Sequence, residues 1–336
     1  MKWTKKEQKQ LIIFVLTAFG LPVLMGCLMG ISFYQGNDVS VFANAHMFYP
    51  ASGVMLALIF TREKGQKLPL KFYFGFLVSG VVMIGSCLAS IIIPKYSWAI
   101  LCQYPIIISS IICLILLFLE KKDVRASYGL KFTGRKGAKS WWYVLLFFIL
   151  YLLRLVISCV IGGQMSALAT IFTDPVTYST IMVLLVFFFI TYTAFFGEEY
   201  GWRYFFQPLL QKRFGPKGGV ILLGVLWGLW HLPLNIFFYS PETWIASVML
   251  QVINCIGFAI FFGYGYMKTE NIWVAVMMHY INNNIAVISG AEAVSNQVIR
   301  WADIPLSILL NLVFIVFIFS KVYKKESLAA SDSVSD

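Results

Sequence analysis

The residues of this 336-residue chain that could do chemistry are few, and they form three clusters late in the sequence. The first cluster is the run 198–203, with the letters EEYGWR. The second places His231 four residues after Trp227, and the third places His279 four residues before Asn283. Carboxylates and imidazoles are the side chains that most often transfer protons in a reaction. The sequence therefore predicts one polar site built from three separate segments.

The spacing within the clusters predicts different tasks. Glu199 and Arg203 are four residues apart with the acid first, the favoured order for an ion pair on a helix. Such a pair leaves Glu198, about 100° further round the helix, as the carboxylate that is free to act as a general base. His279 and Asn283 are also four residues apart, so they project from one helix face towards a common partner.

The composition indicates whether this site lies in a soluble domain or within a lipid bilayer. The chain is 60% hydrophobic and 12% charged, with a mean hydropathy of +0.80, whereas soluble domains are roughly 45–50% apolar and about 25% charged. Apolar runs of about 20 residues recur, which is the length of a helix that crosses a bilayer. We expect an all-α, polytopic transmembrane bundle. An ionisable group inside such a bundle costs at least ~2.5 kcal/mol on insertion scales, so each one is expected to have a partner or a function.

Hydropathy predicts about ten spans. They are residues 11–31, 43–60, 72–93, 99–119, 141–161, 179–210, 219–238, 244–267, 272–289 and 304–320. With both termini in the cytosol, every Lys and Arg outside the spans except Lys95 and Arg300 lies on the inner side, while Arg154 and Arg203 fall within spans. This asymmetry is what the positive-inside rule predicts. The formal charge of +11 therefore reflects membrane topology and does not indicate a nucleic-acid partner.

Depth decides whether the three clusters can meet. At 1.5 Å per residue, Glu198 lies ~21 Å from the basic edge at Lys212, and His231 and Asn283 lie ~21–22 Å from their own basic edges. The clusters then share one level of the bilayer. This agreement requires the sixth helix to continue beyond Gly197, and Pro208 must then kink it, which membrane helices tolerate.

We expect three parts in the chain. Residues 1–140 hold four spans and a basic cytosolic loop, residues 141–325 hold a six-span bundle, and residues 326–336, rich in Ser and Asp, form a disordered tail. All three polar clusters lie within residues 179–290 of this bundle. We see no internal repeat of the kind that many secondary transporters carry.

The three clusters resemble the motifs of the CPBP family, also called the Abi family. It comprises CaaX proteases, among them the type II CaaX prenyl endopeptidases, and bacteriocin-processing enzymes. Its motifs are E-E-x-x-x-R, F-x-x-x-H and H-x-x-x-N. In this chain they are carried by Glu198, Glu199 and Arg203, by Trp227 and His231, and by His279 and Asn283. Trp227 replaces the usual Phe, a departure that we expect to reshape the pocket without changing the chemistry.

The resemblance implies an intramembrane endopeptidase that acts on a membrane-associated peptide or protein, either prenylated or bacteriocin-like. Glu198 would activate a water, His231 would position that water or bind a metal, and His279 and Asn283 would stabilise the oxyanion. Glu199 and Arg203 would orient the site.

The metal question stays open at this point. Glu198, His231 and His279 could bind a divalent metal, most readily Zn²⁺, with a position left for water. A metal-free glutamate mechanism remains the alternative. We expect the protein in the plasma membrane of a bacterial cell. The substrate and the oligomeric state stay undefined.

Two other classes of function compete. Membrane-embedded acids and histidines also build proton and ion pathways, so a transporter is one alternative. A non-catalytic immunity or scaffold protein that retains the motifs is another.

Several further polar or aromatic residues need an interpretation. Arg154 is expected to face the site and to contact Glu199 or a substrate carboxylate; an unrelated pairing or a snorkelling side chain is the alternative. His46 is expected at the membrane interface. Packing is the expected role of the remaining aromatic residues near the motifs, which are Tyr200, Trp202 and Trp230.

Overall fold

The computed structural model describes residues 2–288 and 294–324, apart from the side chains of 167 and 286–288. All regular secondary structure in this part of the chain is helical, which confirms the all-α class. The expected disordered tail, residues 326–336, lies outside the described residues, as do residues 289–293.

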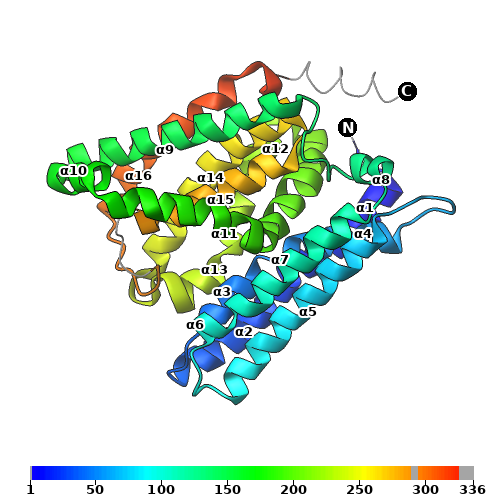
Figure 1. The fold of residues 1–336 in the computed structure, drawn as a ribbon, viewed down its shortest axis with the longest axis horizontal. Helices are drawn as coiled ribbons and strands as arrows, with labels where there is room; N and C mark the ends of the chain where they lie inside the picture. The colour runs from blue at the N-terminus through cyan, green and yellow to red at the C-terminus, as the bar shows by residue number, and fades with distance from the viewer. Residues whose placement is uncertain (1, 289–293, 325–336) are drawn as a thin grey trace.

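The leading half is a layer of membrane-length helices, coloured blue to cyan at the lower right of Figure 1. A π-helical turn, η1 (Leu16–Gly20), joins the first two helices. The α-helices of this layer are α1 (Lys5–Val15), α2 (Leu21–Tyr34), α3 (Ser40–His46), α4 (Tyr49–Phe60), α5 (Leu70–Ile92), α6 (Trp98–Leu101) and α7 (Gln103–Phe118).

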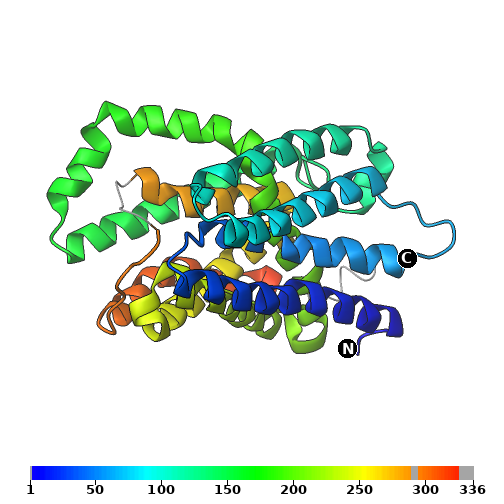
Figure 2. The same cartoon turned by 90° about the horizontal axis from the view of Figure 1, so that it is seen from below.

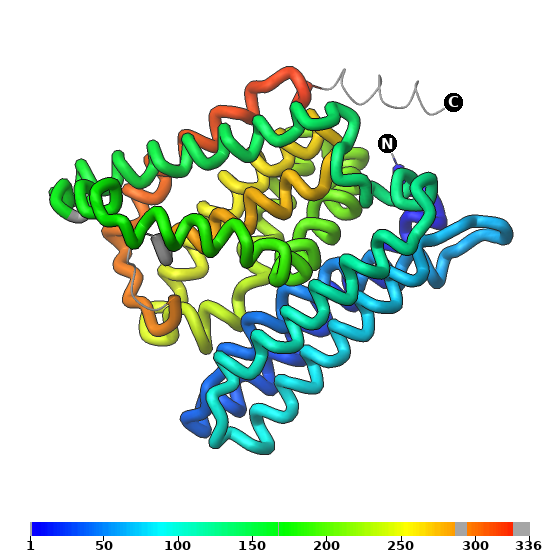
Figure 3. The backbone as a smooth tube through the Cα atoms, in the orientation of Figure 1, coloured from blue at the N-terminus to red at the C-terminus, as the bar shows by residue number. Residues whose placement is uncertain are grey.

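The trailing half runs from green to red in Figure 3. Its α-helices are α8 (Lys122–Ser127), α9 (Trp142–Ile161), α10 (Met165–Thr173), α11 (Pro175–Glu199), α12 (Gln207–Trp230), α13 (Leu232–Leu234), α14 (Trp244–Thr269), α15 (Ile272–Ile288) and α16 (Asp303–Ile315). Its π-helices are η3 (Tyr200–Phe206) and η4 (Asn235–Tyr239), and its 3₁₀ turns are η2 (Gly137–Trp141), η5 (Pro241–Thr243), η6 (Val316–Phe319) and η7 (Lys321–Tyr323). In Figure 2, the green segment that contains α10 projects from the rest at one edge.

The number of spans differs from the expected ten. Among the described residues, seven helices are long and apolar enough to cross a membrane, and one of them, Pro175–Tyr239, is 65 residues long. That helix contains both the sixth and the seventh predicted spans. The ninth and tenth predicted spans correspond to shorter helices, α15 and α16 with its 3₁₀ extension. The polytopic helical bundle is confirmed, whereas the count of ten is not.

The long helical segment is broken at Gly215, whose φ of 81° lies in the left-handed region that favours glycine. Pro216 follows at once and starts the next stretch of helix. A Cβ at Gly219 would lie 2.5 Å from the backbone nitrogen of Gln211, so the two stretches pack closely beside the break. This break accounts for two predicted spans within one continuous helical segment.

The expected continuation beyond Gly197 is present, but it has a different form. The helix passes from α11 into the π-helical segment η3, and Pro208 lies in the first turn of α12. A proline is tolerated there because the N–H groups of a first helical turn have few intrahelical partners. The distortion therefore lies in η3, before the proline, and π-helical segments are frequent at functional sites.

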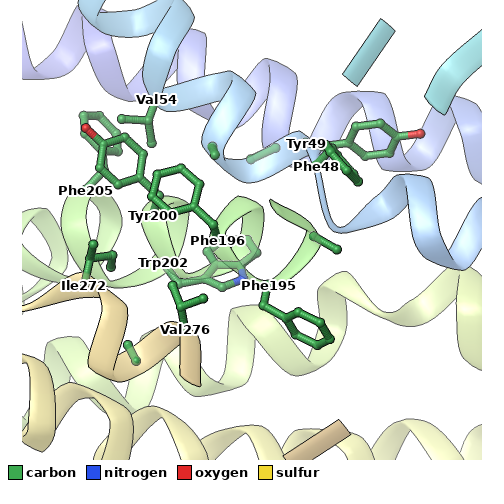
Figure 4. Packing of buried hydrophobic residues seen from close by; sticks show 14 of the residues in the cluster. Phe48, Tyr49, Val54, Phe195, Phe196, Tyr200, Trp202, Phe205, Ile272 and Val276 are labelled. Atoms are coloured by element: carbon green, nitrogen blue, oxygen red, sulfur yellow. The ribbon is translucent and has the colours of Figure 1, made fainter. Parts of the chain in front are cut away.

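The two halves pack against each other through α11, which contacts α4 and α7. Figure 4 shows Phe48 and Tyr49 close to the residues of α11 and η3, and Ile272 and Val276 of α15 on the other side. The hydroxyl groups of Tyr73 and Tyr200 are 2.8 Å apart in a buried hydrogen bond. The leading helices therefore form one wall around the segment that carries the first motif.

Two glycines permit this close approach. A Cβ added at Gly197 would collide with the carbonyl of Met47, and one added at Gly201 would collide with Pro50. The spacing Gly197-x-x-x-Gly201 is the small-residue pattern that lets membrane helices pack backbone to backbone. Glu198 and Glu199 lie between these two contacts, so their backbone is held against the leading half.

Candidate active site

The first motif lies where α11 becomes η3, well inside the bundle. Glu198 is 2% exposed, and Glu199 and Arg203 are completely buried. The helix continues through this region, and its backbone hydrogen bonds change from the α to the π pattern at Tyr200. Two acids and an arginine are thus held at one depth among apolar helices.

The predicted ion pair is present. Nε of Arg203 lies 3.0 Å from Oε2 of Glu199, with both side chains sealed from solvent. The guanidinium also lies 4.7 Å from the ring centroid of Trp227 and 5.4 Å from that of Phe262, distances at which aromatic faces attract a cation. The arginine charge is therefore balanced by one carboxylate and two rings.

Glu199 has a second partner. Its Oε1 lies 2.8 Å from Nδ1 of His279, which donates the hydrogen bond. Glu199 thus links Arg203 on the same helical segment to His279 on α15. This contact fixes the imidazole plane and leaves Nε2 of His279 free to act on another molecule.

Glu198 is held through one oxygen only. Its Oε2 accepts hydrogen bonds from the indole N–H of Trp227 over 2.8 Å and from that of Trp202 over 3.3 Å. Its Oε1 has no hydrogen bond to any described residue. The buried side-chain atoms that lack a partner do not include this oxygen. The free oxygen is therefore accessible.

Trp227 does more than the sequence indicated. A Phe at this position could not donate to Glu198, so the departure from the family pattern changes the hydrogen bonds of the carboxylate. Trp202, expected only to pack, is the second donor. Both contacts have one cause, because an indole N–H in an apolar interior must find an acceptor.

His231 is oriented by the same tryptophan. Its Nδ1 donates to the backbone carbonyl of Trp227 over 2.8 Å, one helical turn back. Because Nδ1 carries the proton, Nε2 of the neutral ring is an acceptor. The carbonyl of His231 accepts in turn from the side chain of Asn235 over 2.9 Å, which fixes the end of this helical stretch.

The three clusters open into one cavity of about 530 Å³. Glu198, His231, His279 and Asn283 all line it, which is the convergence that the depth argument predicted. Asn283 is exposed, and its side-chain oxygen accepts a hydrogen bond from Asn282 over 2.9 Å. The volume lies within the roughly 300–1,000 Å³ range of small-ligand sites.

His46, which the sequence predicts at the membrane interface, belongs to the same site. It is 3% exposed and lines the cavity. Its Nε2 lies 3.0 Å from the carbonyl of Trp230, and the two rings are 3.9 Å apart. The signal in the sequence was weak, because His46 belongs to the leading half and only tertiary packing brings it beside Trp230.

Arg154 faces the cavity as expected, but its partner differs. Its guanidinium donates to the side-chain oxygen of Asn254 over 3.0 Å. Glu199 is already engaged by Arg203 and His279, and among the described residues it forms no ion pair with Arg154. The expected contact with Glu199 is therefore wrong.

The fit of a metal ion can be judged from the donor atoms. Glu198 offers Oε1, and His231 and His279 offer Nε2 while their Nδ1 atoms are held by a carbonyl and a carboxylate, an arrangement common around metal-binding histidines. Nevertheless, across residues 2–288 and 294–324 no group of three His, Cys, Asp or Glu side chains is arranged so that it could hold an ion. The metal site stays a prediction, and no reaction step below is derived through a metal.

Comparison with known proteins relates part of the chain to a protease family. Residues 180–285 match the family model described as "Type II CAAX prenyl endopeptidase Rce1-like". The chain is also 35% identical over 83 residues to the CAAX prenyl protease 2 of Methanococcus maripaludis. That match covers 25% of this chain and 29% of the relative. No solved structure matches the chain. Residues 180–285, which the family model matches, contain all three motifs.

Proposed function

We propose that this chain, which through residues 180–285 belongs to the Rce1-like family of type II CAAX prenyl endopeptidases, is an intramembrane endopeptidase in which Glu198 activates a water. One observation carries the proposal. Glu198 Oε1, His231 Nε2 and His279 Nε2 lack hydrogen-bond partners among the described residues and belong to side chains that line one cavity. A carboxylate base, an imidazole acceptor and a second imidazole nitrogen are what a bound water and a peptide carbonyl require.

The first half of the reaction follows from the hydrogen bonds. Oε1 of Glu198 takes a proton from water while Nε2 of His231 accepts the other water hydrogen and orients it. The oxygen attacks the scissile carbonyl, whose C=O π electrons move to its oxygen. The resulting oxyanion is stabilised by the Asn283 amide and by Nε2 of His279. Glu199 accepts the Nδ1–H of His279, and in the protonated ring Nε2 is a second donor, which can point to the oxyanion.

The second half returns the proton. The oxyanion re-forms the carbonyl and the C–N bond breaks, with its electron pair leaving on nitrogen. The carboxylic acid of Glu198 donates its proton to that nitrogen, so the products are a carboxylic acid and an amine, and Glu198 is ionised again. Arg203 takes no proton; its ion pair with Glu199 holds that side chain in position beside His279.

The substrate that we propose is a membrane-associated peptide. The cavity opens between helices of membrane length, and the family and the relative are both named for prenylated CAAX substrates. A bacteriocin-like peptide is the alternative substrate. We place the enzyme in the plasma membrane of a bacterial cell as part of the same proposal.

The test uses purified protein in liposomes with a membrane-anchored peptide whose cleavage releases a quenched fluorophore, supplied with and without a farnesyl group. Wild type should cleave it, and Glu198→Gln and His279→Ala should not, while the exposed Glu242→Gln serves as control. The competing transport function predicts solute flux across the same liposomes. Flux without cleavage, or cleavage by a folded Glu198→Gln variant, would overturn the proposal.

A further inference from the structure

All three histidines of the chain line the cavity. His231 and His279 belong to the motifs. His46 is the last residue of α3 in the leading half, outside the segment 180–285 that the family model matches. It has no role in the hydrolytic scheme proposed for the motif residues. A polar side chain held inside a membrane bundle is expected to have a partner or a function.

The ring of His46 is anchored on Trp230. Its Nε2 lies 3.0 Å from the backbone carbonyl of Trp230, and because a carbonyl only accepts, Nε2 carries the proton. The ring centroids of the two residues are 3.9 Å apart, and the ring of Tyr49 lies 5.8 Å from that of His46. The imidazole is therefore held in one tautomer and one orientation at the end of α12.

The other ring nitrogen of His46 is available to a ligand. Nδ1 has no hydrogen bond to any described residue, and the buried side-chain atoms that lack a partner do not include it. With the proton on Nε2, Nδ1 cannot donate one to a leaving group, but it can accept a hydrogen bond. A molecule in the cavity that binds here must therefore supply an N–H or O–H group.

The distance to His231 matches the repeat of a bound peptide. The ring centroids of His46 and His231 are 6.4 Å apart, and an extended chain advances about 3.3 Å per residue. A peptide whose scissile carbonyl meets the water at His231 therefore passes His46 within about two residues of that bond. Each backbone N–H that leaves water requires an acceptor. Carboxamides also line the cavity, Asn44 and Gln251 among them, and they are further partners for a peptide backbone.

We propose that Nδ1 of His46 accepts a hydrogen bond from a backbone N–H of the peptide substrate, within two residues of the bond that is cleaved. The inference rests on the proposed function and adds to it a substrate-binding residue from the leading half. Trp230 anchors His46 and is followed directly by His231, so the acceptor and the histidine that orients the water keep a fixed separation. The contact sets which peptide bond reaches Glu198.

The first test replaces one backbone amide at a time in the membrane-anchored peptide by an ester, apart from the bond that is cleaved. The ester oxygen takes the place of the N–H with little change in shape, but it cannot donate. The measured quantity is the amide-to-ester ratio of kcat/KM at each position. At one position wild type should give a ratio of roughly 5 to 100, the range that corresponds to a buried acceptor left unpaired.

Two substitutions of His46 separate binding from structure. The longer side chain in His46→Gln reaches the place of Nε2 but removes the Nδ1 acceptor, so the ratio at that position should fall to about one. The shorter side chain in His46→Asn places its oxygen near the position of Nδ1, so part of the ratio should remain. Tyr49→Phe is the matched control and should keep the whole ratio, because Tyr49 packs against His46 and is not among the cavity-lining residues.

Ratios that are the same in wild type and His46→Gln at every position would overturn the inference, since the N–H selectivity would then come from another group. If His46→Gln nevertheless slowed cleavage of the parent amide, Nδ1 would be assigned to a bound water instead of the peptide.

A binding arm separates this inference from the proposed function. The amide peptide, and versions with an ester at each peptide bond in turn, are added to detergent-solubilised Glu198→Gln protein with and without His46→Gln, and the thermal unfolding midpoint is measured. The amide should raise the midpoint more than one of the esters does, and the two should act equally once His46 is replaced.

Equal effects of the amide and every ester on the Glu198→Gln protein, including no effect of any, would overturn the inference. The expected difference in binding together with an absence of cleavage by wild type would overturn the proposed catalysis and support the binding assignment.

Discussion

The indole N–H of Trp227 donates to Oε2 of Glu198 over 2.8 Å, while the backbone carbonyl of the same residue accepts from Nδ1 of His231. One residue therefore orients both the proposed base and the imidazole opposite it. Its ring lies in addition against the Arg203 guanidinium. The aromatic position of the second motif is thus a link between the carboxylate, the histidine and the buried ion pair.

Trp227→Phe should lower kcat by about tenfold while leaving the thermal unfolding midpoint near that of wild type. The ring that covers Arg203 is retained, but Glu198 loses its shorter hydrogen bond, and a hydrogen bond to a charged group contributes ~1.5 kcal/mol or more. The measurement is steady-state cleavage of the fluorogenic peptide. Trp202→Phe, which removes the 3.3 Å contact, should have the smaller effect; equal wild-type rates in both variants would contradict the assignment of Glu198.

Glu199→Gln should destabilise the protein by roughly 3–5 kcal/mol, because it leaves the fully buried Arg203 without a counter-charge. The double variant Glu199→Met, Arg203→Met removes both charges and should restore the unfolding midpoint. Turnover should nevertheless stay roughly 100-fold below wild type, since His279 loses the acceptor that orients it. Thermal unfolding in detergent and the cleavage assay give the two readouts. A double variant that recovers both would show that Glu199 serves stability alone.

Gly197→Ala should cost about 1–3 kcal/mol and lower turnover, because the added methyl group meets the carbonyl of Met47 and displaces the neighbouring Glu198. Gly85→Ala is the matched control, since that glycine lies in a helix with open space around it. It should be neutral or stabilise by up to ~1 kcal/mol. Thermal unfolding midpoints decide the matter, and equal midpoints for the two variants would contradict the close packing of α11 on the leading half.

Metal dependence is measured with 1,10-phenanthroline and by elemental analysis of the purified protein. If Glu198, His231 and His279 bind Zn²⁺ as the sequence predicts, the chelator should abolish turnover, added zinc should restore it, and the protein should contain one zinc per chain. Turnover that survives the chelator in protein with less than one zinc per chain would contradict the metal site and favour the metal-free glutamate mechanism.

Local spacing was enough to predict several features of the fold and of the candidate site. The order and separation of Glu199 and Arg203 predicted the ion pair that the structure contains. Counting residues from the basic edges predicted that Glu198 and the two histidines share one depth, and they line one cavity. These features depend on helix geometry within one segment, which the sequence specifies directly.

Contacts between distant segments were not predictable in the same way. Nothing near His46 in the sequence indicates its contact with Trp230, which lies 184 residues away. The two indole donors to Glu198 cannot be recognised from the sequence either, because a buried tryptophan has the same pattern whether or not its N–H has a known acceptor. The spacing Gly197-x-x-x-Gly201 on either side of the two acids does indicate that another backbone lies against them.

The central claim is that Glu198 and His231 act as one unit on a single water, and a double-mutant cycle tests it most directly. We measure kcat for Glu198→Gln, His231→Ala and the double variant, with unfolding midpoints to show that each is folded. The account predicts a loss of about 10²–10⁴-fold in each single variant and little further loss in the double. A single variant within tenfold of wild type, or losses that simply multiply in the double, would contradict it.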